Sequence, residues 1–160
     1  AGVYDIHSLG WNYRMSEGHA AVGLVQLSRL PTFLSLRERN ASRLIGQISQ
    51  IKDIELLPLK IGVAKSSWYC VNIEVAEAFR LSRDEVVTKL NSLGVGTSVH
   101  YPVALPFSRY YCTKYNYVNS ADYSNAQRMA KQTISLPCGP HLSEEDVDFV
   151  GGSLLRVFMD

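Results

Sequence analysis

Two polar side chains that could bind an anion stand directly before a predicted helix. The segment at residues 10–17 reads GWNYRMSE, so that Asn12 and Arg14 precede Ser16. A serine at this position accepts hydrogen bonds from the free backbone N–H groups of a first helical turn, and anionic ligands bind at such helix starts. The segment therefore predicts a helix that begins near residue 17, preceded by an amide and a guanidinium that can bind an anion.

A purely structural interpretation of the same segment stays open. Trp11 and Tyr13 could pack beneath a capped core helix, since aromatic side chains are often largely buried. Asn12 would then only form the turn before the helix, and Arg14 would form a structural ion pair.

A second pair of candidate residues, His100 and Tyr101, ends a predicted strand. Residues 97–101 are β-branched and aromatic, and Pro102 follows them directly. Side chains that leave a strand directly before a proline are well placed to point into a cleft. The alternative is a packed histidine that caps the strand end.

The composition indicates a globular protein and excludes several classes. The chain has 160 residues, of which 46% are hydrophobic and 19% charged, which is enough to bury a core. A formal net charge of +1 gives no reason to expect a nucleic acid or an anionic membrane surface as a partner. No apolar run approaches the roughly 20 residues that span a bilayer, so we expect a soluble, cytoplasmic protein.

The cysteines and histidines lack the spacing of a metal site. Three cysteines at long, irregular intervals argue against both a disulfide framework and a zinc site. The four histidines show no metal-ligand spacing either. We therefore predict no metal.

The hydrophobic pattern predicts a helical arm followed by an α+β domain. Apolar residues at helical spacing indicate two helices, over about 17–30 and 31–50, with Pro31 in the first turn of the second. The later part favours a small, mostly antiparallel sheet flanked by helices. Its strands are predicted at 54–57, 69–75, 97–101 and 133–136, and its helices after Ser82, near 121–131 and after Ser143. The arm carries an apolar stripe that one small sheet does not cover completely, so we expect self-association or an exposed apolar patch.

Several motifs resemble one enzyme family in order and spacing. They are NYRMSE at 12–17, GVGTSVHYP at 94–102, RYYCTKY at 109–115 and ISLPCGPHLSEEDV at 134–147. Together they are similar to segments of the DegT/DnrJ/EryC1/StrS family of sugar aminotransferases, which use pyridoxal 5′-phosphate. The resemblance covers nearly the whole chain.

The resemblance implies the C-terminal small domain of a fold-type I aminotransferase. Residues 1–50 would be the approach segment and helical arm, and residues 51–160 the α+β small domain. The N-terminal cofactor-binding domain, with the lysine that forms the aldimine, would lie upstream of this chain. No catalytic residue is therefore expected here, and the chain alone is not expected to be active.

The same resemblance implies the activity and its partners. The parent enzyme would transfer an amino group, typically from glutamate, to a nucleotide-linked keto sugar, and would act as a homodimer in amino sugar biosynthesis. Two alternatives stay open. Some relatives replace the aldimine lysine with histidine and act as sugar dehydratases, and the chain could also be a folding or dimerisation module without catalysis.

The resemblance assigns roles to four residues. Asn12 would reach the cofactor phosphate of the neighbouring subunit, and Arg14 would contact the phosphate or the sugar nucleotide. His100 and Tyr101 would border the sugar-binding pocket. Here the chain departs from the commoner family pattern, because VALP at 103–106 stands where a second histidine usually follows, which indicates a different pocket lining.

Overall fold

The computed structural model describes residues 7–57, 64–115 and 122–159. The chain divides into two compact units, residues 1–32 and 33–160, and each is described by itself. Helix α1 runs from Glu17 to Ile48 and so belongs in part to each unit.

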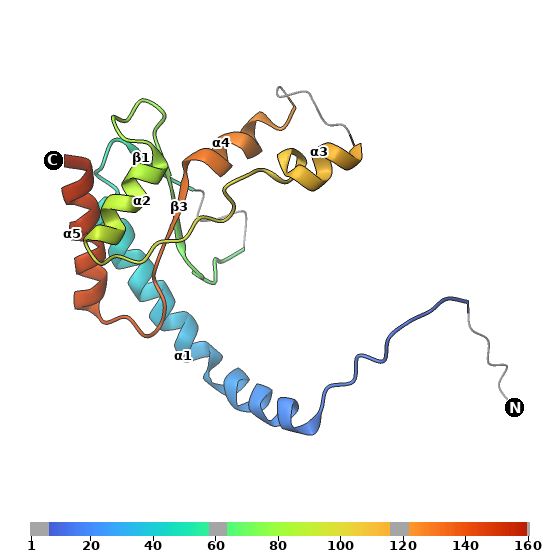
Figure 1. Ribbon diagram of the computed structural model, residues 1–160. Helices are drawn as coiled ribbons and strands as arrows, with labels where there is room; N and C mark the ends of the chain where they lie inside the picture. The colour runs from blue at the N-terminus through green and yellow to red at the C-terminus, as the bar shows by residue number, and fades with distance from the viewer. Residues whose placement is uncertain (1–6, 58–63, 116–121, 160) are drawn as a thin grey trace, which may run out of the picture. The chain divides into compact units, whose positions relative to one another are not determined.

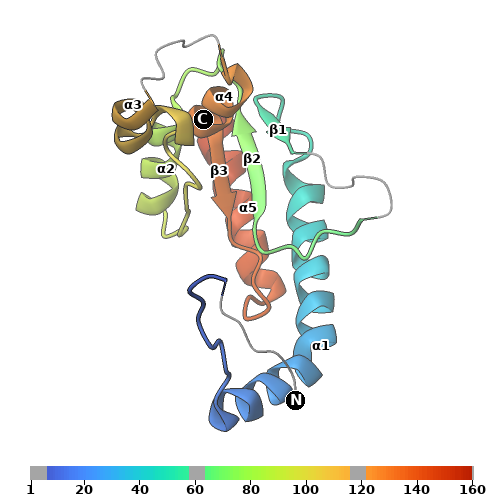
Figure 2. The same ribbon diagram turned by 90° about the vertical axis from the view of Figure 1, so that its right-hand side faces the viewer.

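The second unit is built on a three-stranded antiparallel sheet. Its order is β1-β2-β3, and β2 lies in the middle, as Figure 2 shows. The register places Ile73 opposite Leu56 on one side and opposite Ile134 on the other. The strands span Ile54–Leu56 (β1), Val71–Val75 (β2) and Thr133–Leu136 (β3).

Helices surround this sheet. Figure 1 shows α2 and α5 on one side of β3, with α3 and α4 on the other. The bounds are Arg83–Ser92 (α2), Arg109–Tyr115 (α3), Ser124–Gln132 (α4) and Glu144–Met159 (α5), with a 3₁₀ turn at Leu105–Phe107 (η1). The α+β class predicted from the sequence is confirmed.

One apolar cluster fills the space between the sheet and three helices. Alternate strand residues, Ile73 and Ile134 among them, face it, because successive side chains of a strand point to opposite faces. The helices contribute their apolar stripes, which are fully or almost fully buried. These are Ala41, Leu44 and Ile48 from α1, Val86 and Leu90 from α2, and Val147, Val150, Leu154, Val157 and Phe158 from α5.

The predicted helix caps are present. Ser82 and Glu85 form a capping box at the start of α2, and Gly94 follows that helix with φ of +89°, a conformation that favours glycine. At the start of α5, the backbone N–H of Asp146 donates to Oγ of Ser143 at 3.1 Å, and the Asp146 carboxylate accepts from the Ser143 N–H at 2.8 Å. The Ser143 N–H and the Ser143 hydroxyl, which donates to the same carboxylate at 2.8 Å, lower the pKa of Asp146.

The prediction of two helices before residue 50 was wrong. The structure has one continuous helix, α1, with Pro31 inside it. Proline removes a single i→i−4 hydrogen bond, whereas the bonds on either side of it add cooperatively. Pro31 lies between two stretches with helical apolar spacing, and it therefore did not mark the end of a helix.

The predicted strand at 97–101 was also wrong. Its only ladder contact among the described residues is a bridge between Ser98 and Ser135, with N–O distances of 2.8 and 3.1 Å in the two directions. The chain bends away at His100, after this single pair, and Pro102, which lacks an N–H donor, cannot resume the ladder. The helix predicted near 121–131 exists as α4 and begins at Ser124; residue 121 lies outside the described residues.

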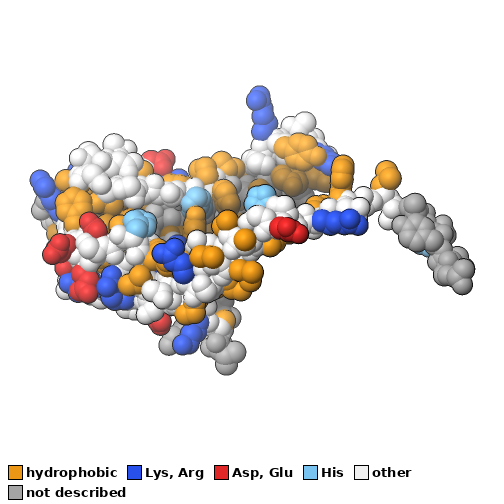
Figure 3. All heavy atoms as spheres, turned by 90° about the horizontal axis from the view of Figure 1, so that it is seen from below, with side chains coloured by type: hydrophobic (Ala, Val, Ile, Leu, Met, Phe, Trp, Pro, Cys, Tyr) orange, Lys and Arg blue, Asp and Glu red, His pale blue; other side chains and the backbone are white. Residues whose placement is uncertain are grey.

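Exposed apolar side chains are concentrated in the first unit. Trp11 and Tyr13 are 83% and 91% exposed, so they do not pack beneath a core helix. The first half of α1 exposes Val22, Leu24, Val25, Leu27 and Leu30. Hydrophobic side chains are visible on the surface in Figure 3. This agrees with the expected exposed apolar patch on the arm.

Candidate functional site

The predicted anion-binding segment precedes a capped helix. Oγ of Ser16 accepts from the backbone N–H of His19 at 3.4 Å, as a helix N-cap does. Asn12 and Arg14 are both exposed. Their backbones form a turn, in which the Arg14 N–H donates to the Asn12 carbonyl at 2.7 Å. Among the described residues no partner bonds to either side chain, so both groups are available to a ligand.

The face of the sheet opposite the core is polar. Asn72 and Ser135 are opposite each other on β2 and β3, and Oγ of Ser135 donates to Oδ1 of Asn72 at 2.7 Å. Glu74 and Thr133 form the next pair along these strands. Strand alternation therefore gives the sheet a row of polar groups on its second face.

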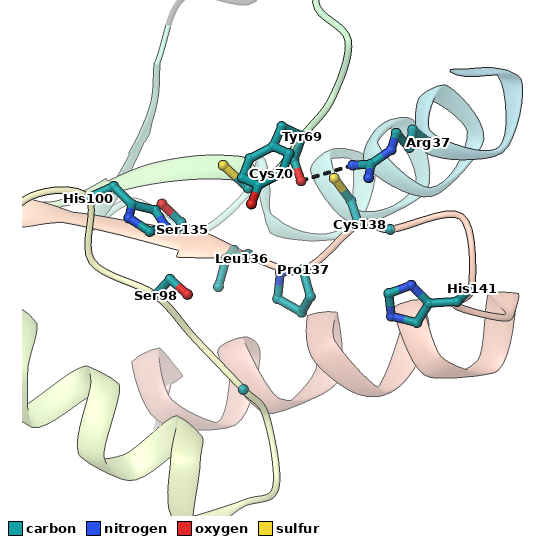
Figure 4. A pocket seen from close by; sticks show the side chains of 12 residues that line it. Arg37, Tyr69, Cys70, Ser98, His100, Ser135, Leu136, Pro137, Cys138 and His141 are labelled. Carbon is teal, nitrogen blue, oxygen red and sulfur yellow. Dashed lines mark hydrogen bonds between the residues drawn. The ribbon is translucent and has the colours of Figure 1, made fainter. Parts of the chain in front are cut away.

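A cleft of about 280 Å³ borders this polar face. Figure 4 shows Arg37 and His141 at one end of it, and His100, Ser98 and Ser135 at the other. The complete lining is Arg37, Tyr69, Cys70, Gly96, Ser98, His100, Ser135, Leu136, Pro137, Cys138, Gly139 and His141. One end of the cleft is thus cationic and the other carries hydroxyl groups and an imidazole.

Arg37 is held by backbone carbonyls rather than by an acid. Its Nη1 donates to the carbonyls of Trp68 and Tyr69 at 2.9 and 3.1 Å, and its guanidinium lies 5.7 Å from the centre of the Tyr69 ring. Trp68 has φ of +50°, a left-handed conformation that is strained for a bulky residue. The carbonyl of this strained residue also accepts from Cys138 Sγ at 3.1 Å.

Cys138 stays a neutral thiol in this cleft. Burial raises its pKa to about 11, and the nearby Arg37 charge offsets this only in part. A thiolate is the nucleophilic form of cysteine, so Cys138 is not suited to nucleophilic catalysis.

Gly139 allows the His141 ring to lie close to the chain. A Cβ atom at residue 139 would come within 2.5 Å of the His141 ring, closer than real Cβ contacts. The glycine therefore lets the imidazole occupy the cationic end of the cleft.

His100 also lines a second cleft, of about 240 Å³, together with Tyr101. Tyr101 is 73% exposed, and its ring meets the His100 ring edge to face at a centroid distance of 5.7 Å. The predicted cleft position of this pair is therefore what the structure shows, although no strand leads into it. Val103 and Leu105, from the segment that departs from the family pattern, line the same cleft and make that wall apolar.

A buried carboxylate lies opposite Thr133 in the sheet. Glu74 is 2% exposed and pairs with Arg128 of α4. Its Oε1 and the Oγ1 of Thr133 are buried and have no hydrogen-bond partner within the described ranges. Thr133 also lines the second cleft, which therefore carries a hydroxyl group as well as the apolar side chains of Val103 and Leu105.

The four predicted site residues fall into two groups. Asn12 and Arg14 belong to the first unit, and His100 and Tyr101 to the second. Sequence reasoning missed Arg37, Ser135 and His141. The position of Ser135 between the apolar residues Ile134 and Leu136 could have indicated the polar face of a strand. Arg37 is one of several charged residues in a helical segment, and nothing in the sequence distinguishes it from them.

The described residues show neither a metal-binding cluster nor a membrane-spanning helix. Among the described residues, no cluster of three or more histidine, cysteine or acidic side chains could hold a metal ion. None of the helices described here has the length and apolar character that crossing a membrane requires.

The sequence matches the DegT/DnrJ/EryC1/StrS aminotransferase family over residues 2–155, and the chain belongs to this family. It is 33% identical to the spore coat polysaccharide biosynthesis protein SpsC of Bacillus subtilis, over 92% of this chain and 38% of that protein. It is 31% identical to the dTDP-4-amino-4,6-dideoxy-D-glucose transaminase of Shigella dysenteriae, over 96% of this chain and 41% of that protein.

The fold is similar to that of solved aminotransferases. Helicobacter pylori PseC, an aminotransferase involved in the biosynthesis of pseudoaminic acid, superimposes with a TM-score of 0.84 at 26% identity. The alignment covers 97% of this chain and 40% of that one. The chain thus spans about two-fifths of the length of the relatives that it matches.

The available donors fit one end of pyridoxal phosphate. An exposed amide and guanidinium before the N-terminus of the 32-residue helix α1 suit a phosphate dianion. The other groups that the cofactor needs are a lysine and an acid beside the pyridine nitrogen, and the cleft at Arg37 has neither among its lining residues. The described residues therefore fit the phosphate but do not complete a cofactor site.

Proposed function

We propose that this chain is the C-terminal part of a pyridoxal phosphate-dependent aminotransferase that acts on nucleotide-linked keto sugars, with glutamate as the amino donor. The observation that carries the proposal is the family match over residues 2–155. A relative that is 31% identical bears the name of a transaminase of a dTDP-linked amino sugar, which supports a nucleotide sugar as substrate.

The geometry supports a binding role for this part of the enzyme. Asn12 would donate from its amide to the cofactor phosphate across the interface between two subunits, and Arg14 would add positive charge near it. When bound, the cofactor supplies the electron sink for amino-group transfer. His100 and Tyr101 would contact the sugar beside the apolar wall of Val103 and Leu105.

Amino transfer is tested with the whole enzyme that contains this chain. We would supply pyridoxal phosphate, a nucleotide-linked 4-keto sugar and glutamate labelled with ¹⁵N at the amino group. The proposal predicts that ¹⁵N appears in the sugar and that 2-oxoglutarate accumulates in equal amount. Loss of a sugar hydroxyl without ¹⁵N incorporation would instead indicate a dehydratase and contradict the proposal.

The role of Asn12 has a separate test. Asn12→Ala removes a hydrogen bond to a charged acceptor, which contributes about 1.5–3 kcal/mol, so the apparent affinity for the cofactor should fall by about 10- to 100-fold. Titration of the apo-enzyme with pyridoxal phosphate, followed by absorbance, measures this. The control is Asn125→Ala, which removes another exposed amide. An unchanged affinity in Asn12→Ala would mean that the residue only forms the turn.

A further inference from the structure

Arg37 carries a charge that no acid within the described ranges balances. The side chain is half-buried, and no described residue forms an ion pair with it. None of the residues that line its cleft is an aspartate or a glutamate. A partly buried charge without a counter-ion costs free energy, and an anionic ligand would remove that cost.

The free edge of the guanidinium has the geometry of an oxyanion site. Arginine has five N–H donors in a rigid fork, and the two carbonyl bonds of Arg37 both use Nη1. This leaves Nε–H and the Nη2 donors, and two parallel N–H groups of a guanidinium bind a carboxylate in bidentate fashion. The bonds to Trp68 and Tyr69 and the stacking on the Tyr69 ring fix the orientation of this edge.

The surroundings add donors and supply no competing anion. Cys138 lies against Arg37 but remains a thiol, because burial raises its pKa to about 11. His141 stands at the same end of the cleft, and the hydroxyls of Ser98 and Ser135 at the other. The lining can therefore solvate an anion at one end and a polar group at the other.

We propose that the cleft at Arg37 binds the carboxylate of a small organic acid, which in the enzyme would be the amino-acid donor or the keto acid formed from it. The identity of the ligand rests on the proposed function, whereas the carboxylate site rests on the geometry alone. A volume of about 280 Å³ suits such a ligand. It lies just below the roughly 300–1,000 Å³ of pockets for drug-sized molecules, so the cleft favours a small acid over a whole nucleotide sugar.

Binding can be measured on the 160-residue chain without cofactor. We would titrate the ¹⁵N-labelled chain with L-glutamate and with 2-oxoglutarate, and follow the amide resonances of Ser135, Leu136 and Cys138 by NMR. Inorganic phosphate and UDP-glucose are the comparison ligands. The proposal predicts saturable shifts with both carboxylates, and at least 10-fold weaker effects with phosphate and UDP-glucose.

Three variants and one control locate the site. Arg37→Met should weaken carboxylate binding at least 10-fold, and Arg37→Lys, which keeps the charge but loses the fork, by several-fold. Gly96→Leu should block the cleft while leaving Arg37 intact, because a side chain at Gly96 starts in open space. Lys131→Met removes an exposed charge elsewhere and should change binding less than twofold.

Four results would overturn the inference. These are the absence of a saturable shift, tighter binding of phosphate or UDP-glucose at the same amides, unchanged binding in a folded Gly96→Leu variant, and equal losses in Lys131→Met and Arg37→Met. If Arg37→Met fails to fold, Gly96→Leu and Arg37→Lys still decide. No result depends on amino transfer, so this site can fail while the proposed function stands, and the reverse.

Discussion

On β3, Ile134 and Leu136 point into the core, whereas Ser135 between them bonds to Asn72 on the opposite face. The core face is closed by helices and its described strand residues are apolar, while the other face carries hydroxyl, amide and carboxylate groups beside two clefts. One strand of four residues thus packs into the core with one face and lines a cleft with the other. The difference shows that the alternation of a strand separates the residues that hold the fold from those that can meet a ligand.

The largest expected effect is on the core face. Ile73→Ala should lower the free energy of unfolding by about 2–5 kcal/mol, because it removes buried methyl groups and leaves a cavity. Urea unfolding followed by circular dichroism measures the change. The matched control is Val103→Ala on the exposed wall of the second cleft, which should cost less than about 1 kcal/mol. Equal losses in the two variants would contradict the division between the faces.

A somewhat smaller effect is expected where the polar face buries a charge. Arg128→Met leaves the Glu74 carboxylate buried without its partner, which we expect to cost about 3 kcal/mol, since breaking a buried pair is strongly destabilising. Arg128 itself is partly exposed, so water can offset part of the loss. The double variant with Glu74→Gln should recover most of the stability. If the double variant is no more stable than Arg128→Met, the unpaired charge is not the cause.

The smallest effect concerns the helix that covers the core face. The pKa values of Asp146 and Asp148 are lowered, chiefly by hydrogen bonds from Ser143 and from Arg43, respectively. A lowered pKa means that the native state favours the charged form. The resulting stability is therefore present above the ordinary aspartate pKa of 3.8, and is lost as the pH falls through the lower native values.

We therefore expect the unfolding midpoint to fall as the pH drops below the ordinary aspartate pKa of 3.8, and part of this fall to vanish in Asp148→Asn. Both groups are exposed, so the effect should shrink at high salt. Thermal unfolding across this pH range measures it. A pH dependence identical in Asp148→Asn and the parent chain would contradict the assignment.

Local signals were sufficient to predict much of the fold. The capping residues Ser16, Ser82 and Ser143 marked three helix starts correctly, because each cap is a contact within one turn. The alternation around Ile73 located the central strand β2, and β3 was predicted at its observed bounds. Pro31 misled the sequence analysis, since the continuity of α1 depends on the cooperativity of the whole helix.

The site was less predictable, because its parts come together only through the sheet. His100 and Tyr101 were expected in a cleft because they end a predicted strand; the strand is absent, the two residues line a cleft, and their role stays a prediction. Arg37 and Ser135 are 98 residues apart in the sequence, yet they line the same cleft. No local sequence pattern shows that two such distant residues line the same cleft. The roles of Asn12 and Arg14 stay predictions.

Neighbouring residues on β3 give the most direct test that one face holds the fold and the other serves the reaction. In the whole enzyme, we would compare Ser135→Ala with Ile134→Ala, whose side chain is buried in the core and lines neither cleft, for both unfolding free energy and kcat/KM for amino transfer, measured where each variant is folded. We predict that Ile134→Ala loses about 2–5 kcal/mol of stability and keeps kcat/KM, whereas Ser135→Ala loses about 1 kcal/mol and at least 10-fold in kcat/KM. An unchanged kcat/KM in Ser135→Ala, or equal losses of activity in both variants, would contradict this account.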